Sequence, residues 1–183
     1  MFDSSYPFKY ICNRFDKAKS EDDVSKTVHI FAFYGKKGHK YIVEVEQYEY
    51  HLYALKYYLK HHQDSSNKYK LTSRLNEMQP VIRTCLNIML DLYSKDPLAS
   101  FGFIGSPSLN ETTNHTQRHR IYSRVMENFF SPQSFQHYSD PGKSIYFIVN
   151  QHASRELAEG LETHIVKIWN VLCQGTDYTP FDK

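Results

Sequence analysis

The sequence predicts a single α/β domain, of the α+β kind, in which a mixed, mostly antiparallel sheet is packed against helices. Two stretches of alternating apolar residues flank a glycine-containing turn, which is typical of a β-hairpin. A nearly apolar helical stripe follows mid-chain, and further strand and helix patterns come after it. The length of 183 residues suits one domain, and the 40% hydrophobic content excludes global disorder.

Charge and cysteine content limit the binding partners and the cellular compartment to be expected for the protein. The net charge of +2 comes from 22 basic and 20 acidic residues, which is too balanced for a dedicated nucleic-acid binder. Cys12, Cys85 and Cys173 are too far apart to indicate a disulfide framework or a zinc site. Neither a signal peptide nor an apolar run of about 18 residues is present. We therefore expect a cytoplasmic protein without a metal and without a membrane segment.

The sequence predicts a β-hairpin at the N-terminal end of the core. Residues 1–26 are polar and are expected to form an arm or a short helix, ahead of an α/β core over 27–150. Apolar residues alternate over 28–33 and again over 41–45, and the turn between them contains two glycines, Gly35 and Gly38. One face of this hairpin should lie in the core and the other should be partly solvated.

The middle of the core contains a third strand and a central helix. Residues 50–60 fit both a strand and a helix, and their tyrosine density favours the strand. Pro80 suits the first turn of a helix that ends before Pro97. A short apolar run over 98–104 predicts a buried strand. The stripe of the central helix consists of Val81, Cys85, Met89 and Leu92.

A second helix and a second hairpin follow. The helix is expected over 117–130, with a solvated side that carries Arg118, Arg120 and Arg124. Strands are expected over 135–138 and 144–150, around the turn Asp140-Pro141-Gly142. A last helix over 154–173, with Ser154 as its N-cap, would pack on the core as part of a C-terminal segment, 151–183.

This order of elements resembles the GNAT superfamily of N-acyltransferases. In that fold a hairpin and a third strand lead to a central helix, a parallel strand, another helix and a closing strand. The resemblance covers residues 27–150 and consists of element order. It implies binding of acetyl-coenzyme A or another acyl-coenzyme A and transfer of the acyl group to an amine.

The family binds the coenzyme A pyrophosphate with a glycine-containing loop before the central helix. The corresponding segment here, 68–77, has no glycine, which departs from the family pattern. Charge and hydroxyl groups could replace the glycine backbone as phosphate ligands. The residues that the resemblance assigns to this role are Lys70, Thr72, Ser73 and Arg74.

The family also uses a tyrosine on the later helix to protonate the departing thiolate, and Tyr122 holds that place here. A carboxylate in the central strands often serves as general base. Glu44 and Glu46 are the strand carboxylates of this chain, and their alternation predicts ordinary solvent-facing residues. His115 and His119 share the i, i+4 spacing of metal ligands, but no third ligand is evident, so exposed histidines are expected.

Two functions remain open from the sequence. The chain could be a divergent acyl-coenzyme A-dependent N-acyltransferase with Tyr122 as its acid. Alternatively, it is a catalytically inactive scaffold of the same fold that acts as a protein-interaction or regulatory module. The missing glycines favour the second reading slightly.

Overall fold

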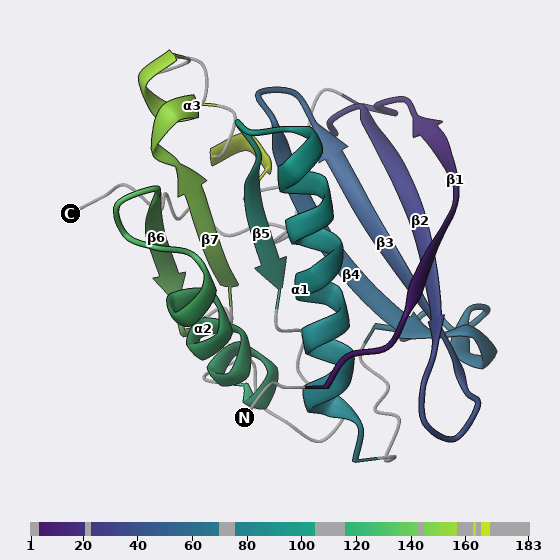
Figure 1. Cartoon of the computed structure of the whole chain (residues 1–183). Coiled ribbons are helices and arrows are strands. Elements are labelled where there is room, and N and C mark those ends of the chain that lie inside the picture. The colour runs from purple at the N-terminus through teal and green to yellow at the C-terminus, as the bar shows by residue number, and fades with distance from the viewer. Residues whose placement is uncertain are drawn as a thin grey trace.

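The strands of this protein form one mixed sheet. The computed structural model describes residues 4–20, 23–69, 76–104, 116–142, 145–156, 163 and 166–168. Within these residues, seven strands lie in the order β1-β2-β3-β4-β5-β7-β6 (Figure 1). The strands are β1 (Phe8–Asp16), β2 (Lys26–Tyr34), β3 (Lys40–Tyr48), β4 (Leu52–Leu59), β5 (Ser100–Ile104), β6 (Phe135–Asp140) and β7 (Ile145–Asn150).

The predicted fold class is confirmed. The parallel pair in this sheet is β4 with β5, and the remaining neighbours are antiparallel. The tyrosine-rich stretch that fitted both a strand and a helix is the strand β4. The antiparallel hairpin β2–β3 pairs from Thr27↔Gln47 to Tyr34↔Lys40, as the alternation predicts.

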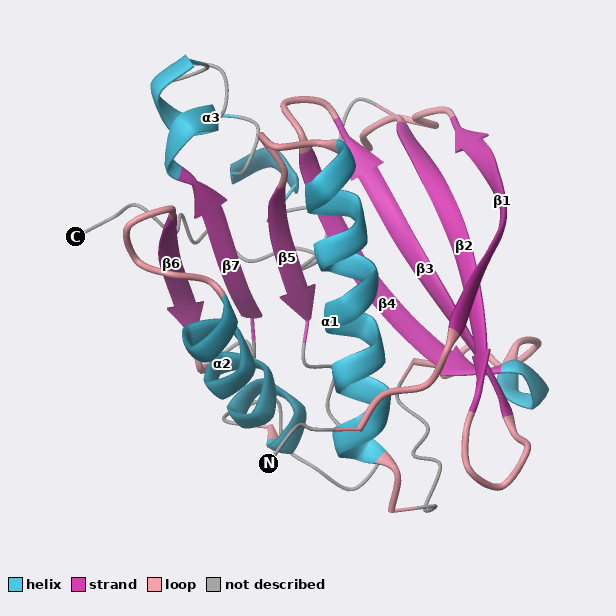
Figure 2. Ribbon diagram, in the orientation of Figure 1, coloured by secondary structure: helices cyan, strands magenta, loops and turns pink. Residues whose placement is uncertain are grey.

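Two long helices cover one face of the sheet. The helix α1 (Met78–Lys95) and the helix α2 (Gln117–Phe129) lie side by side in front of the strands (Figure 2). The apolar stripe predicted for the central helix is buried, and it packs in one cluster with sheet residues such as Phe31, Val43 and Phe101. The principal core therefore lies between this face and the two helices.

The expectation for the N-terminal segment was wrong. In place of an arm or a short helix, residues Phe8–Asp16 form the edge strand β1, which pairs with β2. A register shift between Tyr10 and Cys12 interrupts the alternation. Seven of the nine residues of β1 are exposed, so no apolar face marks the strand in the sequence.

The helix after β7 also begins earlier than predicted. The helix α3 (Gln151–Glu156) follows the strand directly. The Asn150 side chain accepts a hydrogen bond from His152 N at 2.9 Å, so Asn150 caps this helix in place of Ser154. Of the predicted C-terminal helix, positions 157–162, 164–165 and 169–173 lie outside the described residues.

The turn between β3 and β4 has an unusual backbone. Tyr50 and His51 both have φ of 57°, and Leu52 N donates to Glu49 O at 3.4 Å. Two successive positive φ values suit the tight turn of a right-twisted hairpin, where asparagine and glycine are the usual residues. Here a tyrosine and a histidine adopt this conformation at a cost of about 1–3 kcal/mol each.

Candidate functional site

The candidate site lies where the parallel pairing of β4 and β5 ends. The two strands pair from Leu52↔Ser100 to Leu55↔Phe103. Beyond that point β4 continues to Leu59 beside β3. Tyr57 stands in this extension, on the side of the sheet that α1 and α2 cover. Side chains from three elements therefore meet at the end of the parallel pair.

Aromatic rings fill the space beyond the last β4–β5 pair. Tyr122 of α2 reaches this point, and its side chain is hydrogen-bonded to that of Tyr57. The Phe103 ring lies 5.1 Å from the Tyr122 ring, centroid to centroid. Tyr122 is only 5% exposed. The predicted catalytic tyrosine thus faces the end of the parallel pair but is closed off from solvent.

Burial controls the protonation of this cluster. It raises the pKa of the Tyr122 hydroxyl well above its ordinary value, and the neighbouring Tyr57 raises it further, whereas the Arg118 cation lowers it. Burial also raises the pKa of Tyr57 and of the Cys85 thiol on α1. Tyrosine and cysteine side chains with ordinary pKa values are mostly protonated at neutral pH, and these upward shifts move all three further from ionisation.

Arg118 links this cluster to the chain that follows β4. Its guanidinium lies 5.7 Å from the centroid of the Tyr57 ring, and it donates a hydrogen bond to the carbonyl oxygen of Tyr69. Arg118 is 8% exposed, so the predicted solvated position for this residue was wrong. The first turn of α2 is thereby joined to the segment that precedes the predicted coenzyme A residues.

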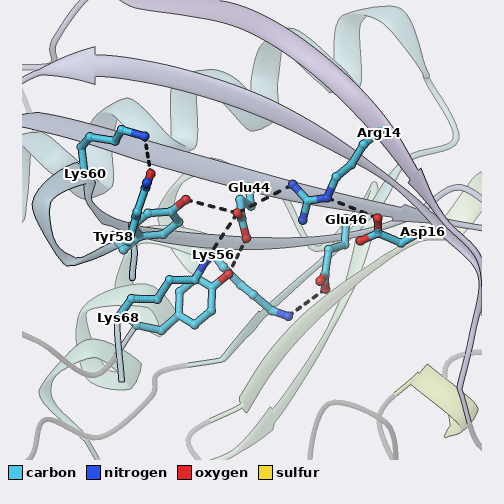
Figure 3. A network of polar contacts seen from close by, with 10 residues as sticks. Arg14, Asp16, Glu44, Glu46, Lys56, Tyr58, Lys60 and Lys68 are labelled. Atoms are coloured by element: carbon cyan, nitrogen blue, oxygen red, sulfur yellow. Dashed lines mark hydrogen bonds and ion pairs between the residues drawn. The ribbon is translucent and has the colours of Figure 1, made fainter. Parts of the chain in front are cut away.

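The other side of that segment is held by Glu44 on β3. Figure 3 shows Arg14, Tyr58 and Lys68 converging on its carboxylate. Tyr58 donates to Glu44 at 3.3 Å, Lys68 Nζ lies 3.5 Å away and Arg14 lies 3.9 Å away. The Tyr69 hydroxyl also donates to Glu44. Tyr69 is therefore held at both its hydroxyl and its carbonyl.

The expectation that the strand carboxylates face solvent was also wrong. Glu44 is 6% exposed and Glu46 is 8% exposed. Glu46 accepts from Tyr48 at 2.8 Å and lies 2.9 Å from Lys56 Nζ. The alternation placed both residues on the face opposite α1, but it gave no sign that another segment would cover that face. Because each carboxylate is engaged by cations and hydroxyls, neither is assigned as a general base.

The residues predicted to bind coenzyme A precede α1 in the sequence. Lys70, Thr72, Ser73 and Arg74 lie outside the described residues. Their described neighbour at the start of α1 is Glu77, which is 5% exposed. Its carboxylate accepts hydrogen bonds from Lys37 N at 3.3 Å and from the Tyr41 hydroxyl at 3.4 Å. A carboxylate near a helix N-terminus is favourable for the helix dipole.

Sequence reasoning missed a second buried polar residue on α2. His119 is 4% exposed, and its Nε2 lies 3.2 Å from both the Ile145 carbonyl oxygen and Ser139 Oγ. The expectation of an exposed histidine was therefore wrong for His119, and His115 lies outside the described residues. For the buried Arg118, the sequence did contain an indication: Arg118, Tyr122 and Val125 have the i, i+4, i+7 spacing of residues on one face of a helix.

Comparisons with known proteins do not assign the chain to a family. No protein-family model, no curated protein and no solved structure matches the chain. Among the described residues, no group of three or more histidine, cysteine, aspartate or glutamate side chains could hold a metal ion. Over the same residues, the helices are too short or too polar to cross a bilayer.

Proposed function

We propose that this chain is a GNAT-like protein that binds acyl-coenzyme A and transfers the acyl group to an amine. The observation that carries the proposal is the placement of Tyr122 at the end of the parallel β4–β5 pair, beside Tyr57 and Phe103. The order of the strands and helices, which the resemblance anticipates, supports the same reading.

Each group in the proposed reaction has a distinct role. Acyl-coenzyme A would supply an acyl group activated as a thioester. The amine nitrogen attacks the carbonyl carbon, a C–N bond forms and the C–S bond breaks. Tyr122 Oη gives its proton to the departing thiolate, and the proton lost by the amine passes to solvent. Proton donation requires a protonated phenol, which a tyrosine already is at neutral pH with its ordinary pKa of about 10.

The phosphate groups would be held by the segment after Tyr69. Lys70 and Arg74 offer cations and Thr72 and Ser73 offer hydroxyls, a donor set that suits anionic phosphate oxygens. The nearby Glu77 carboxylate accepts hydrogen bonds from the backbone N–H of Lys37 and from the Tyr41 hydroxyl. Charge and hydroxyl contacts would then replace the close backbone approach that glycine gives the family.

A second candidate function is a scaffold of this fold without the chemistry, serving as a protein-interaction or regulatory module. Two observations favour it. Tyr122 is buried and hydrogen-bonded to the partly buried Tyr57, and the segment 68–77 has no glycine.

Kinetics of the full chain distinguish the two functions. Acetyl-coenzyme A is mixed with a panel of primary amines, and released coenzyme A is quantified by chromatography. Transfer that exceeds the protein-free rate supports the acyltransferase. If Tyr122 is the acid, Tyr122→Phe lowers kcat by about 10²-fold or more and leaves KM for acetyl-coenzyme A within about twofold.

A matched control separates the acid from the packing of the ring. Tyr93→Phe removes a hydroxyl from a partly buried tyrosine that packs against the same core and is distant from α2 in sequence. It should leave kcat unchanged. Equal rates for the wild type and Tyr122→Phe would remove Tyr122 as the acid, and transfer no faster than the protein-free rate with every amine would leave the scaffold function.

A further inference from the structure

A cavity of about 480 Å³ lies at the far end of α1 from the predicted coenzyme A segment. It opens between the last turn of the helix and the strands β1 to β4. Its volume is within the range of small-molecule sites. The residues that matter for its chemistry are three aromatic side chains, Tyr10, Phe31 and Tyr53, and four polar ones, His29, Gln47, His51 and Asp96.

The polar side chains form one hydrogen-bonded chain. Tyr53 Oη lies 2.8 Å from Asp96 Oδ2, and His51 Nδ1 lies 2.8 Å from the same carboxylate. Gln47 Nε2 lies 3.0 Å from Tyr53 Oη, and Gln47 Oε1 lies 2.7 Å from His29 Nε2. The sequence gives no hint of this chain, because its members come from three strands, a turn and the end of a helix.

The carboxylate of Asp96 fixes the direction of every hydrogen bond in this chain. An ionised carboxylate only accepts, so His51 must donate from Nδ1 and Tyr53 must donate from its hydroxyl. The Tyr53 oxygen then accepts from the Gln47 amide nitrogen. That orientation turns the Gln47 oxygen toward His29, which must donate from Nε2.

In the neutral form of each imidazole, the ring nitrogen outside this chain of hydrogen bonds is an acceptor. With His51 Nδ1 and His29 Nε2 as the donors, the lone pairs lie on His51 Nε2 and His29 Nδ1. Among the described residues that line the cavity, Lys95 carries an ammonium group, and its Nζ is held by Asp91 at 2.6 Å. Asp96 thus has an imidazole and hydrogen-bond donors around it, but no lysine or arginine among the described residues pairs with it.

Two further features make the cavity suitable for a cation. Tyr10, Phe31 and Tyr53 line it, and aromatic rings attract cations. The C-terminal end of α1 carries the negative end of the helix dipole, and Asp96 lies at that end.

We propose that this cavity binds the primary ammonium group of an organic ligand, with Asp96, His51 Nε2 and the aromatic rings as its recognition elements. A primary ammonium offers three N–H donors, which can be accepted by the Asp96 carboxylate, His51 Nε2 and His29 Nδ1. The site is separate from Tyr122. Cys85 of α1 lies in the cluster around Tyr122, and about 16 Å of helix axis separates Cys85 from Asp96. The ammonium ligand is therefore distinct from the acyl acceptor.

Titration of the full chain with n-butylammonium tests the proposal. Binding is followed by NMR shifts of the His29 and His51 rings, with 1-butanol and tetramethylammonium as comparison ligands. n-Butylammonium should bind at least about tenfold more tightly than 1-butanol, which lacks the charge, and more tightly than tetramethylammonium, which lacks N–H donors.

An aspartate that does not line the cavity provides the control variant. Asp96→Asn removes the charge of the site and should weaken n-butylammonium binding at least about tenfold, whereas Asp64→Asn, at an exposed position outside the cavity lining, should change it less than about twofold. Equal binding of n-butylammonium and 1-butanol, or equal effects of the two variants, would overturn the proposal.

The ring nitrogens give a test that does not depend on a variant folding. Long-range ¹H–¹⁵N spectra of the wild-type protein distinguish the two neutral tautomers of each histidine. The Nδ1–H form of His51 and the Nε2–H form of His29 are required. The opposite tautomer at His51 would leave a donor at the cavity instead of an acceptor and would contradict the proposal.

Discussion

The guanidinium of Arg118 donates a hydrogen bond to the backbone carbonyl of Tyr69, and this contact joins the start of α2 to the segment after β4. The same Tyr69 donates its hydroxyl to Glu44 on the opposite face of the sheet. The helix that carries Tyr122 and the segment that leads to the predicted coenzyme A residues are therefore anchored to a common residue.

Replacement of Arg118 should affect both stability and ligand binding. Arg118→Ala removes a charge-assisted hydrogen bond from a buried site and should lower the free energy of unfolding by about 2 kcal/mol, as measured by urea denaturation. Because Tyr69 loses one anchor, affinity for acetyl-coenzyme A should fall as well. Arg124→Ala, at an exposed position of the same helix, should change stability by less than about 0.5 kcal/mol. Similar losses for the two variants would contradict the role given to Arg118.

Loss of the Glu44 charge should destabilise the face opposite α1. Glu44→Gln leaves Lys68 without its carboxylate partner, whereas Arg14 keeps Asp16. A loss of about 1–3 kcal/mol is expected, because the Tyr58 and Tyr69 hydroxyls also lose a charged acceptor at a buried position. The control is Glu49→Gln on the exposed β3–β4 turn. Urea denaturation of both variants measures the difference, and a Glu44→Gln variant as stable as the control would show that the network contributes nothing.

A side chain at position 35 should conflict with Glu77. A Cβ added to Gly35 would overlap Glu77 Oε2, so the carboxylate would have to leave Lys37 N and the Tyr41 hydroxyl. Gly35→Ala should therefore cost about 1–3 kcal/mol. The cost should be smaller in a Glu77→Ala background, which a double-mutant cycle measures. Additive effects in that cycle would exclude the conflict.

Alkaline pH should destabilise the protein partly through Tyr58. Burial and the nearby Glu44 raise the pKa of its hydroxyl to about 12, above the unfolded value of about 10. The unfolded state therefore loses this proton first, and stability falls as pH rises from about 10 through 12. Urea denaturation between pH 9 and 11 should show a shallower decline for Tyr58→Phe than for the wild type. Tyr34→Phe, at a position that is 60% exposed, should decline as the wild type does. The same slope for Tyr58→Phe and the wild type would count against this assignment.

Much of the fold follows from local patterns in the sequence. Alternation identified β2 and β3, the apolar stripe identified α1, and proline and glycine marked several element ends. The strand β1 was missed because its register shift and its exposure remove the alternation on which strand prediction depends. The cap of α3 was missed because an asparagine at the end of a strand can equally begin a helix.

The candidate site was less predictable, because its residues are brought together by tertiary structure. The place of Tyr122 on α2 was anticipated, but its contact with Tyr57 depends on how far β4 extends past β5. Glu44 alternates as a surface residue would, and only the return of Lys68 and Tyr69 across that face buries it. A local sequence pattern does not show which distant segment will pack on a given face of a strand.

Calorimetric titration of the full chain with acetyl-coenzyme A tests the proposed function most directly. Saturable binding that weakens as salt is raised is expected, because cations and hydroxyls of the segment 70–74 would hold the phosphates. The double replacement Lys70→Ala and Arg74→Ala should weaken it further. Heats that show no saturation up to millimolar acetyl-coenzyme A would contradict acyl-coenzyme A binding and with it the acyltransferase.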